Sequence, residues 1–357
     1  MVILIRRNLI DLPINYSVSY YWSVGFVLSM FMIIQILTGV LLSFLYIGDY
    51  NNSFFMVMSL SNDSFFIWCL RYWHIIGVNL LFILIFVHML RSLYYSGYNK
   101  KGVWNVGFLL YLLLMGEAFT GYILPWHQMS YWAATVLTSI IESLPFVGPS
   151  LYSYVVGGFS VSGVTLIRVL SVHIWLGFII LGLMVIHMYY LHKKGSSNPL
   201  YSFYYSGDVV YFHSYFTIKD FFLFMVFGSF VIVWLFLNPD LLLDIESYLE
   251  ADPLSTPVSI KPEWYFLAFY TILRCIGSKI GGIVLILSFL FFLWVPTNGG
   301  SSVYSLVRQV IFWFIISLFV SLTYLGGCHP EYPYLIVGQL FSVFLVMLMF
   351  IYKVFSL

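Results

Sequence analysis

Eight apolar runs, separated by polar or Gly- and Pro-containing connections, dominate the hydrophobic pattern of this 357-residue chain. A helix needs about 20 predominantly apolar residues to cross the ~30 Å hydrocarbon core of a membrane. The sixth run is short, and we expect Lys279 to extend it by reaching toward the interface. The pattern predicts an all-α polytopic membrane protein with eight transmembrane helices. The runs cover residues 20–45, 66–90, 103–124, 169–191, 221–237, 280–295, 310–325 and 335–352.

Composition supports a membrane as the solvent of this chain. Hydrophobic residues make up 62% of the sequence, charged residues only 8%, and the mean hydropathy is +0.97. Soluble domains carry about 25% charged residues. The net charge of +1 and the absence of a basic run leave no surface for neutralising phosphates, so we exclude nucleic acid as a partner. Basic residues gather in the connections on one side of the eight-span arrangement, which places that side inward.

Four histidines stand in the second and fourth runs at one repeated interval. His74 and His88 are fourteen positions apart, and so are His173 and His187. Fourteen residues advance a helix by ~21 Å and return to nearly the same face. Two such helices side by side would present two facing histidine pairs at different depths, and each pair can supply the axial ligands of a haem. The interval therefore predicts two stacked haems.

Four glycines repeat the same interval in the first and third runs. Gly25 and Gly39 are fourteen apart, as are Gly107 and Gly121. Glycine in a membrane helix allows another body to approach closely. We expect the first four helices to form a di-haem four-helix bundle, with the glycines leaving room at the depths of the porphyrin edges. A single histidine or glycine would be read as an ordinary bundle contact, but four equal intervals favour the haem interpretation.

Further residues near these pairs carry charge. Arg71, Arg91 and Arg168 lie close to the histidines in sequence, and they are candidate partners of anionic haem propionates. Without the histidines they would be read as interfacial cations. Three cysteines are scattered, and no Cys-x-x-Cys-His motif exists for covalent attachment, so the haems are expected to be non-covalent.

A polar inner connection, residues 193–215, divides the chain. We place a boundary after residue 207, which gives an N-terminal di-haem domain of residues 1–207 and a C-terminal four-helix domain of residues 208–357. Two outer connections, residues 127–165 and 238–278, are longer than a turn requires, and long structured loops are frequent places for functional residues.

Two other functions deserve comparison with the haem interpretation. A secondary transporter would use intramembrane Arg, His and Glu as a proton relay, and it predicts an internal repeat with helix breaks in matching halves, which we do not find. A haem-bearing membrane anchor of a soluble dehydrogenase would explain the histidines but not the second four spans.

The chain resembles the cytochrome b family of ubiquinol–cytochrome c reductase, respiratory complex III, over nearly its whole length. The resemblance is carried by the four histidines and four glycines, by Gly121-Tyr122-Ile123-Leu124-Pro125-Trp126, by Gly157-Gly158-Phe159-Ser160, and by Pro262-Glu263-Trp264-Tyr265. Equal spacing in both histidine pairs and the fusion of both halves make it similar to the respiratory form rather than to the split photosynthetic form.

The resemblance implies a function and a set of sites. His74 and His173 would bind a low-potential haem near the outer face, and His88 and His187 a high-potential haem near the inner face. Quinol would be oxidised outside and quinone reduced inside, coupled to proton translocation. The outer site would include Tyr122, Ala133 and the 130–140 segment with Pro262, Glu263 and Tyr265; the inner site would include His192, Ser196, Lys219 and Asp220.

The resemblance also implies partners and a location. The chain would work as a homodimer with a Rieske iron–sulfur protein, cytochrome c1 and other complex III subunits, using ubiquinone and ubiquinol. The expected location is the mitochondrial inner membrane, with the bacterial plasma membrane as the alternative. From the residues alone, His192 and Asp220 are equally well read as proton donors at the inner face or as solvated interfacial residues.

Three positions depart from the family pattern. His127 stands where glycine is usual, Ala133 where glycine is common, and Ser162 where aspartate is frequent. In addition, Glu117 places a carboxyl at membrane depth, four positions before Gly121 and so on the same helix face. No role follows for Glu117 from the sequence.

Overall fold

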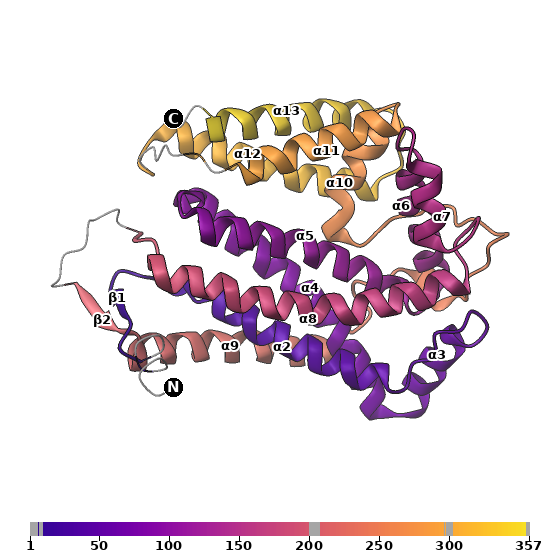
Figure 1. Cartoon of the computed structure of the whole chain (residues 1–357), viewed down its shortest axis with the longest axis horizontal. Coiled ribbons are helices and arrows are strands. Elements are labelled where there is room, and N and C mark those ends of the chain that lie inside the picture. The colour runs from indigo at the N-terminus through magenta and orange to yellow at the C-terminus, as the bar shows by residue number, and fades with distance from the viewer. Residues whose placement is uncertain (1–5, 7–9, 200–207, 296, 298–302, 355–357) are drawn as a thin grey trace. The chain divides into compact units, whose positions relative to one another are not determined.

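In its described residues, the computed structural model of the chain is mainly helical, with two three-residue strands, β1 (Pro13–Asn15) and β2 (Val209–Tyr211), that pair antiparallel (Figure 1). It describes residues 6, 10–199, 208–295, 297 and 303–354. The predicted domain boundary after residue 207 falls at 200–207, outside the described residues. The α-helices are α2 (Val24–Ser43), α3 (Ser53–Asp63), α4 (Phe65–Tyr94), α5 (Lys101–Ile123), α6 (Gln128–Glu142), α7 (Gly148–Val156), α8 (Gly163–Lys194), α9 (Phe212–Leu237), α10 (Trp264–Cys275), α11 (Lys279–Trp294), α12 (Leu306–Gly327) and α13 (Tyr334–Val354).

Each predicted apolar run coincides with one of these helices. Within the described residues, seven helices are long and apolar enough to cross a membrane, and they are α2 with the preceding short turn, α4, α5, α8, α9, α12 and α13. The sixth run forms α11, which has 16 residues. At ~1.5 Å per residue it is ~24 Å long, shorter than the ~30 Å hydrocarbon core. The chain is therefore a multi-pass, all-α membrane protein.

Contacts between Cα atoms group the chain into two compact units. The first comprises Met1–Leu45, Leu60–Met115 and Trp175–Leu242, and the second comprises Tyr46–Ser59, Gly116–Ile174 and Leu243–Leu357. The long helices α5 and α8 each contribute residues to both units. His74, His88 and His187 lie in the first unit, and His173 lies in the second.

In the first unit, α2 packs along α4, and α9 lies against both helices (Figure 1). The fully buried side chains here include apolar ones of α2 and α4, such as Phe31, Ile76, Leu80 and Phe82. Apolar side chains all around these helices are expected where the environment is lipid on one side and protein on the other. Because lipid is as apolar as these side chains, the helices associate through close packing, which small or shape-matched residues allow.

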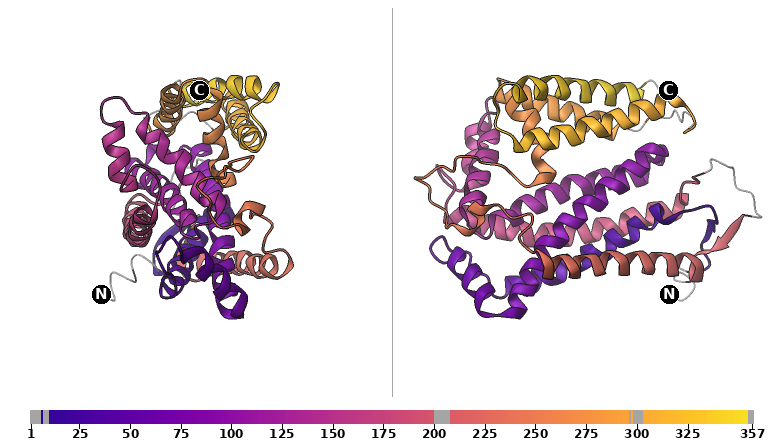
Figure 2. Two further views of the ribbon diagram at one scale, coloured as in Figure 1. Left: turned by 90° about the vertical axis from the view of Figure 1, so that its right-hand side faces the viewer. Right: turned by 180° about the vertical axis from the view of Figure 1, so that it is seen from behind.

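In the second unit, α10 packs against α11, α12 and α13, and α13 also contacts α11 and α12 (Figure 2). Ser278 and Ser305 begin α11 and α12 by accepting hydrogen bonds from backbone N–H groups three residues on. Such caps satisfy amide groups that a helix start leaves unpaired. Tyr270 donates to the carbonyl of Ile260 over 3.0 Å and so ties α10 to the segment that precedes it.

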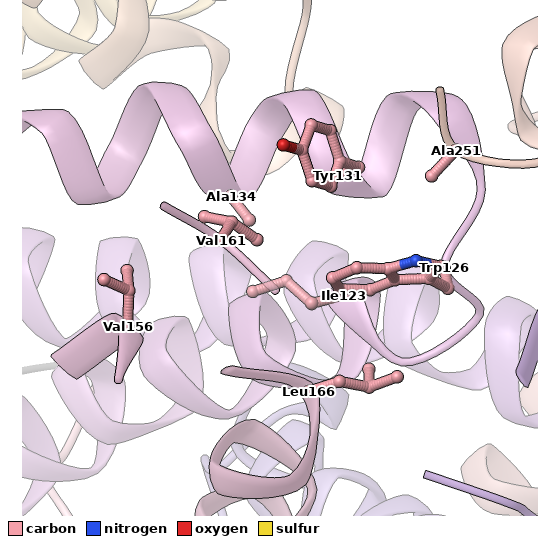
Figure 3. Packing of buried hydrophobic residues seen from close by; sticks show 8 residues of the cluster. All are labelled: Ile123, Trp126, Tyr131, Ala134, Val156, Val161, Leu166 and Ala251. Atoms are coloured by element: carbon pink, nitrogen blue, oxygen red, sulfur yellow. The ribbon is translucent and has the colours of Figure 1, made fainter. Parts of the chain in front are cut away.

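The two long outer connections join each other in the second unit. Gln128 accepts from the Asp252 backbone over 2.8 Å and donates to the Ser255 carbonyl over 2.6 Å, while its own backbone N–H donates to Leu249 over 2.8 Å. Beneath these bonds lies an apolar cluster shown in Figure 3, formed by Ile123, Trp126, Tyr131, Ala134, Val156, Val161, Leu166 and Ala251. The cluster fixes the start of α6 against the end of α5.

Candidate functional site

Each of the four glycines lies against the imidazole ring of one histidine. A Cβ placed on Gly25 would meet His88 Cε1 at 3.1 Å, and one on Gly107 would meet His187 Cε1 at 2.9 Å. The corresponding distances are 3.3 Å from Gly39 to His74 and 2.6 Å from Gly121 to His173. Contacts this short leave little or no room for a side chain. The glycines on α2 and α5 therefore make space for the imidazoles on α4 and α8.

His88 and His187 face each other in the first unit. Their ring centroids are 6.3 Å apart and the ring planes are inclined by 60°. Two imidazoles on opposite sides of one metal ion would have centroids about 6.5 Å apart, given metal–nitrogen bonds of about 2.0–2.1 Å and about 1.2 Å from nitrogen to ring centre. The observed separation fits this arrangement and is too long for a direct hydrogen bond between the rings. The pair is suited to hold an ion between them.

His74 has a defined hydrogen-bond partner at Nδ1. The hydroxyl of Thr38 lies 2.9 Å from Nδ1, and the same hydroxyl lies 3.0 and 3.1 Å from the carbonyls of Ile34 and Gln35. Because the hydroxyl proton is used toward these carbonyls, its oxygen accepts from Nδ1–H. A neutral imidazole with its proton on Nδ1 carries its lone pair on Nε2, which is the form that binds a metal.

His173 has the same orientation of its proton in the second unit. Nδ1 lies 3.0 Å from the carbonyl oxygen of Glu117, 3.2 Å from its carboxyl Oε1, and 3.4 Å from the hydroxyl of Thr120. The Thr120 hydroxyl itself is within donating distance of the Gly116 and Glu117 carbonyls, at 3.0 and 2.9 Å. All three groups near Nδ1 act as acceptors, so Nε2 again carries the lone pair.

The three candidate arginines lie near these rings in different ways. Arg91 Nη2 is 3.2 Å from Nδ1 of His88, and its guanidinium stacks over Trp22 at 5.1 Å. Arg168 donates to the Tyr154 carbonyl, and a Cβ on Gly157 would meet its guanidinium carbon at 3.1 Å. Arg71 is 3.5 Å from the Ser61 hydroxyl. Arg91 therefore directly contacts one of the four histidines.

An apolar cleft lies in the second unit between α6 and α10. Ala133 on α6 and Pro262, just before α10, both line it, so the structure brings these two predicted site residues together. The space between these helices, part of which is open to solvent, measures about 470 Å³. The rest of the lining is also hydrophobic, which suits a flat apolar ring. The other residues are Val136, Leu137, Ile140, Ile260, Phe266, Phe269, Tyr270, Leu273 and Ile286.

Glu263 stands at the edge of this cleft, next to Pro262, at the start of α10. Burial and the neighbouring negative charge of Asp244 raise the pKa of the Glu263 carboxyl to about 7. Asp244 is itself 3.6 Å from Lys261 Nζ. Burial, with further contributions from Glu263 and Tyr122, also raises the pKa of the Tyr265 phenol. A half-buried carboxyl that titrates near neutral pH beside an apolar cleft is suited to accept a proton.

The predicted inner residues are found at helix ends in the first unit. Asp220 is 8% exposed and accepts a hydrogen bond from Ser23. Lys219 donates to the Val18 carbonyl over 2.8 Å and lies over the ring of Tyr20 at 4.9 Å. His192 stands in the last turn of α8, and Ser196 follows that helix. These contacts order the segment at residues 18–23 against the start of α9.

Comparisons with known proteins decide the family. The family model described as Cytochrome b/b6/petB matches residues 9–195, and the model described as Cytochrome b(C-terminal)/b6/petD matches residues 250–346. A curated protein named Cytochrome b from Brachionus plicatilis is 40% identical over 340 residues, which cover 94% of this chain and 89% of the relative. The chain belongs to the cytochrome b family of respiratory complex III.

A solved structure titled "Hyperthermophilic respiratory Complex III" contains a chain with the same fold. It superposes with a TM-score of 0.91 at 27% identity, covering 100% of this chain and 96% of that one. Membership in the cytochrome b family establishes a subunit of an oxidoreductase complex and implies haem binding. The four histidines, each lying against a glycine that leaves room for its ring, are residues that could fit such a group.

His127, which replaces the glycine usual in the cytochrome b family, has a structural role here. It caps α6, where its Nδ1 accepts from the Ser130 backbone N–H over 3.0 Å. The ring is 3% exposed and packs edge-on against Tyr122, with centroids 5.3 Å apart. The hydrogen bond from Ser130 leaves the neutral ring with its proton on Nε2. This departure from the family is therefore accommodated by a helix cap.

Sequence reasoning missed Thr38 and Thr120, although a signal for them exists. Each immediately precedes the outer glycine of its helix, and the two helices share the order Trp-x-Val-Gly-Phe and Thr-Gly at corresponding positions, beginning at Trp22 and Trp104. The sequence analysis, which sought matching halves, did not detect this shorter repeat. Through this repeat, Gly39 and the Thr38 hydroxyl lie against His74. Gly121 and the Thr120 hydroxyl lie against His173 in the same way.

Proposed function

We propose that this chain holds two non-covalent b haems, His74 with His173 for an outer haem and His88 with His187 for an inner one. The observation that carries this proposal is the 6.3 Å separation of the His88 and His187 rings, together with the glycine that makes room for each of the four imidazoles. Bis-histidine haem supplies one-electron transfer. The chain's own task is to orient four imidazoles and keep water away from them.

Acid–acetone extraction followed by pyridine haemochrome analysis tests this proposal. All haem should leave the polypeptide on extraction, and the extract should contain two haems b per chain. Haem that stays on the polypeptide would rule out non-covalent binding, and no haem in the extract would favour the transporter interpretation.

The cleft between α6 and α10 is proposed as the outer site for ubiquinol. Its apolar lining accepts the quinol ring, and the Glu263 carboxylate at its edge accepts a proton as the quinol is oxidised. Tyr122 and Tyr265 form the buried surroundings that hold the carboxyl partly desolvated. Asp244 interacts with both Glu263 and Lys261, and it is proposed to lead the accepted proton toward water.

Changing Ala133 to Gly should increase sensitivity to methoxyacrylate-type inhibitors of quinol oxidation while turnover stays nearly the same. The Ala133 methyl narrows the cleft wall, and a rigid inhibitor tolerates this less than a flexible substrate does. Ala134→Gly is the matched control, because Ala134 is buried on the same helix but packs in the cluster of Figure 3. Equal sensitivity of wild type and Ala133→Gly would show that this methyl does not shape the site.

The inner site is proposed to reduce ubiquinone, with Asp220 and His192 supplying protons and Ser196 and Lys219 contributing polar contacts. The position of His192 in the last turn of α8, and of Lys219 and Asp220 about two turns into α9, supports this proposal. Arg71, Arg91 and Arg168 are proposed partners of haem propionates, and Arg91 would give up its contact with His88 for such a partner.

Replacing Asp220 with Asn should slow re-oxidation of the inner haem by quinone, because the amide cannot deliver a proton. Stopped-flow spectroscopy after a pulse of reductant measures this rate. Asp208→Asn, an exposed acid before α9, is the control and should leave the rate unchanged. Normal re-oxidation in Asp220→Asn with full haem content would remove the residue from the inner site.

The wider assembly follows from the family. We propose a homodimer that works with a Rieske iron–sulfur protein, cytochrome c1 and other complex III subunits, in the mitochondrial inner membrane or, alternatively, a bacterial plasma membrane. Electrons from quinol would pass through both haems to quinone, coupled to proton translocation. The division into residues 1–207 and 208–357 remains our proposed domain organisation. We also propose α11 as the eighth membrane span, extended by Lys279.

A further inference from the structure

Glu117 is the one acidic side chain within hydrogen-bonding distance of any of the four proposed ligands among the described residues. Its carboxyl Oε1 lies 3.2 Å from Nδ1 of His173, and the side chain is 16% exposed. Its other oxygen, Oε2, is buried without a hydrogen-bond partner within the described part of the chain. A carboxyl in a membrane helix is costly, and such residues generally face a functional group. Here the group it faces is a proposed haem ligand.

The repeat between α2 and α5 provides an internal comparison. Glu117 stands four positions before Gly121, and the corresponding residue four positions before Gly39 is Gln35, an uncharged residue of the same shape. Gln35 packs against Gly77 on α4, and the acceptor at His74 Nδ1 is the Thr38 hydroxyl. The two ligands proposed for the outer haem therefore differ, because Glu117 adds a carboxyl at His173.

The inner pair has the opposite charge nearby. Arg91, a cation that only donates hydrogen bonds, lies 3.2 Å from Nδ1 of His88. An acceptor on the N–H of a ligating imidazole makes the ring a stronger electron donor to the metal, and a negative charge favours the oxidised ion. A nearby cation has the reverse effect. The carboxyl at His173 thus favours a lower reduction potential for a haem bound there.

We infer that Glu117 is a positioning residue that holds His173 by its Nδ1–H and lowers the reduction potential of the haem bound there. This rests on the proposed ligation by His173. The hydrogen bond requires only that a carboxyl oxygen accept, which both oxygens can do in the charged form and the carbonyl oxygen in the neutral form. The Thr120 hydroxyl and the Glu117 backbone carbonyl orient the same N–H, so removal of the carboxyl leaves the ring in place.

Redox titration of the purified complex, followed at the b-haem absorbance, tests this role in Glu117→Leu and Glu117→Gln. Glu117→Leu should raise the midpoint potential of one haem and leave the other unchanged. Glu117→Gln should produce a smaller rise, because its amide oxygen still accepts but carries no charge. Glu142→Gln, an exposed acid at the end of α6, is the matched control and should shift neither haem.

Haem content separates this inference from the function on which it depends. Two haems per chain with unchanged potentials in Glu117→Leu would overturn the role of Glu117 and leave the haem ligation intact. If Glu117→Leu loses haem, the redox titration of Glu117→Gln tests the role instead. Unchanged midpoint potentials in Glu117→Gln would then overturn the role of Glu117. Wild-type protein without haem would instead contradict the proposed function itself.

Discussion

Replacing His88 with Leu is expected to remove one of the two b haems and leave the other. The His88 ring is paired with His187 at a centroid separation of 6.3 Å, and leucine offers no nitrogen to complete the pair. A haem bound here would be held far more weakly by one histidine than by two. The pyridine haemochrome assay should therefore fall from two haems per chain to one.

His329→Leu is the control for this experiment. His329 is exposed after α12 and contacts none of the glycines that face the four ligands. It should retain both haems, as should His192→Leu at the end of α8. Full haem content in His88→Leu would show that His88 is not a ligand, whereas loss of both haems in the control would show that the assay reports general instability.

Replacing Glu263 with Gln should slow quinol oxidation by about 10²-fold, the lower end of the effect of a positioned proton acceptor. Both haem spectra should remain normal, because Glu263 lies at the apolar cleft and the haem ligands are elsewhere in the sequence. The glutamine keeps the size of the side chain but has no carboxylate to accept the proton. Steady-state reduction of cytochrome c with added quinol measures the rate, and Glu250→Gln, an exposed acid of the same connection, is the control.

The pH dependence of the rate of quinol oxidation tests the role of Glu263 independently. Burial and Asp244 raise the pKa of Glu263 to about 7, so the carboxylate is the minor form below pH 7 and the major form above it. The rate in the wild type should therefore rise as pH increases through about 7, and this rise should be missing in Glu263→Gln. A normal rate in the variant, with the same pH profile, would reject Glu263 as the proton acceptor.

The helices were predictable from the sequence because each apolar run is long enough to require a span. Their ends were less so: α8 was expected over 169–191 and extends from Gly163 to Lys194, and α4 ends at Tyr94 instead of 90. Hydrogen bonding continues a helix into the polar interface, where hydropathy no longer marks it. The outer segment expected at 130–144 formed α6, and its start at Gln128 depends on the His127 cap.

The sites were predictable only in part. Equal spacing predicted the relative depths of the four proposed ligands, but not that each glycine would face one imidazole, which depends on how α2 and α5 are rotated. The same-face argument placed Glu117 near Gly121, yet its contact with His173 Nδ1 required the position of α8. Pro262 and Ala133 were joined by resemblance, and the cleft that they share depends on packing between α6 and α10.

The central claim is that this chain carries two haems in different environments, each held by one histidine pair. An anaerobic redox titration of the wild-type complex at the b-haem absorbance tests it most directly. The account predicts two one-electron components of equal amplitude, with the lower potential belonging to the component that His88→Leu retains. A single component, or a His88→Leu variant that retains the higher-potential component, would contradict it.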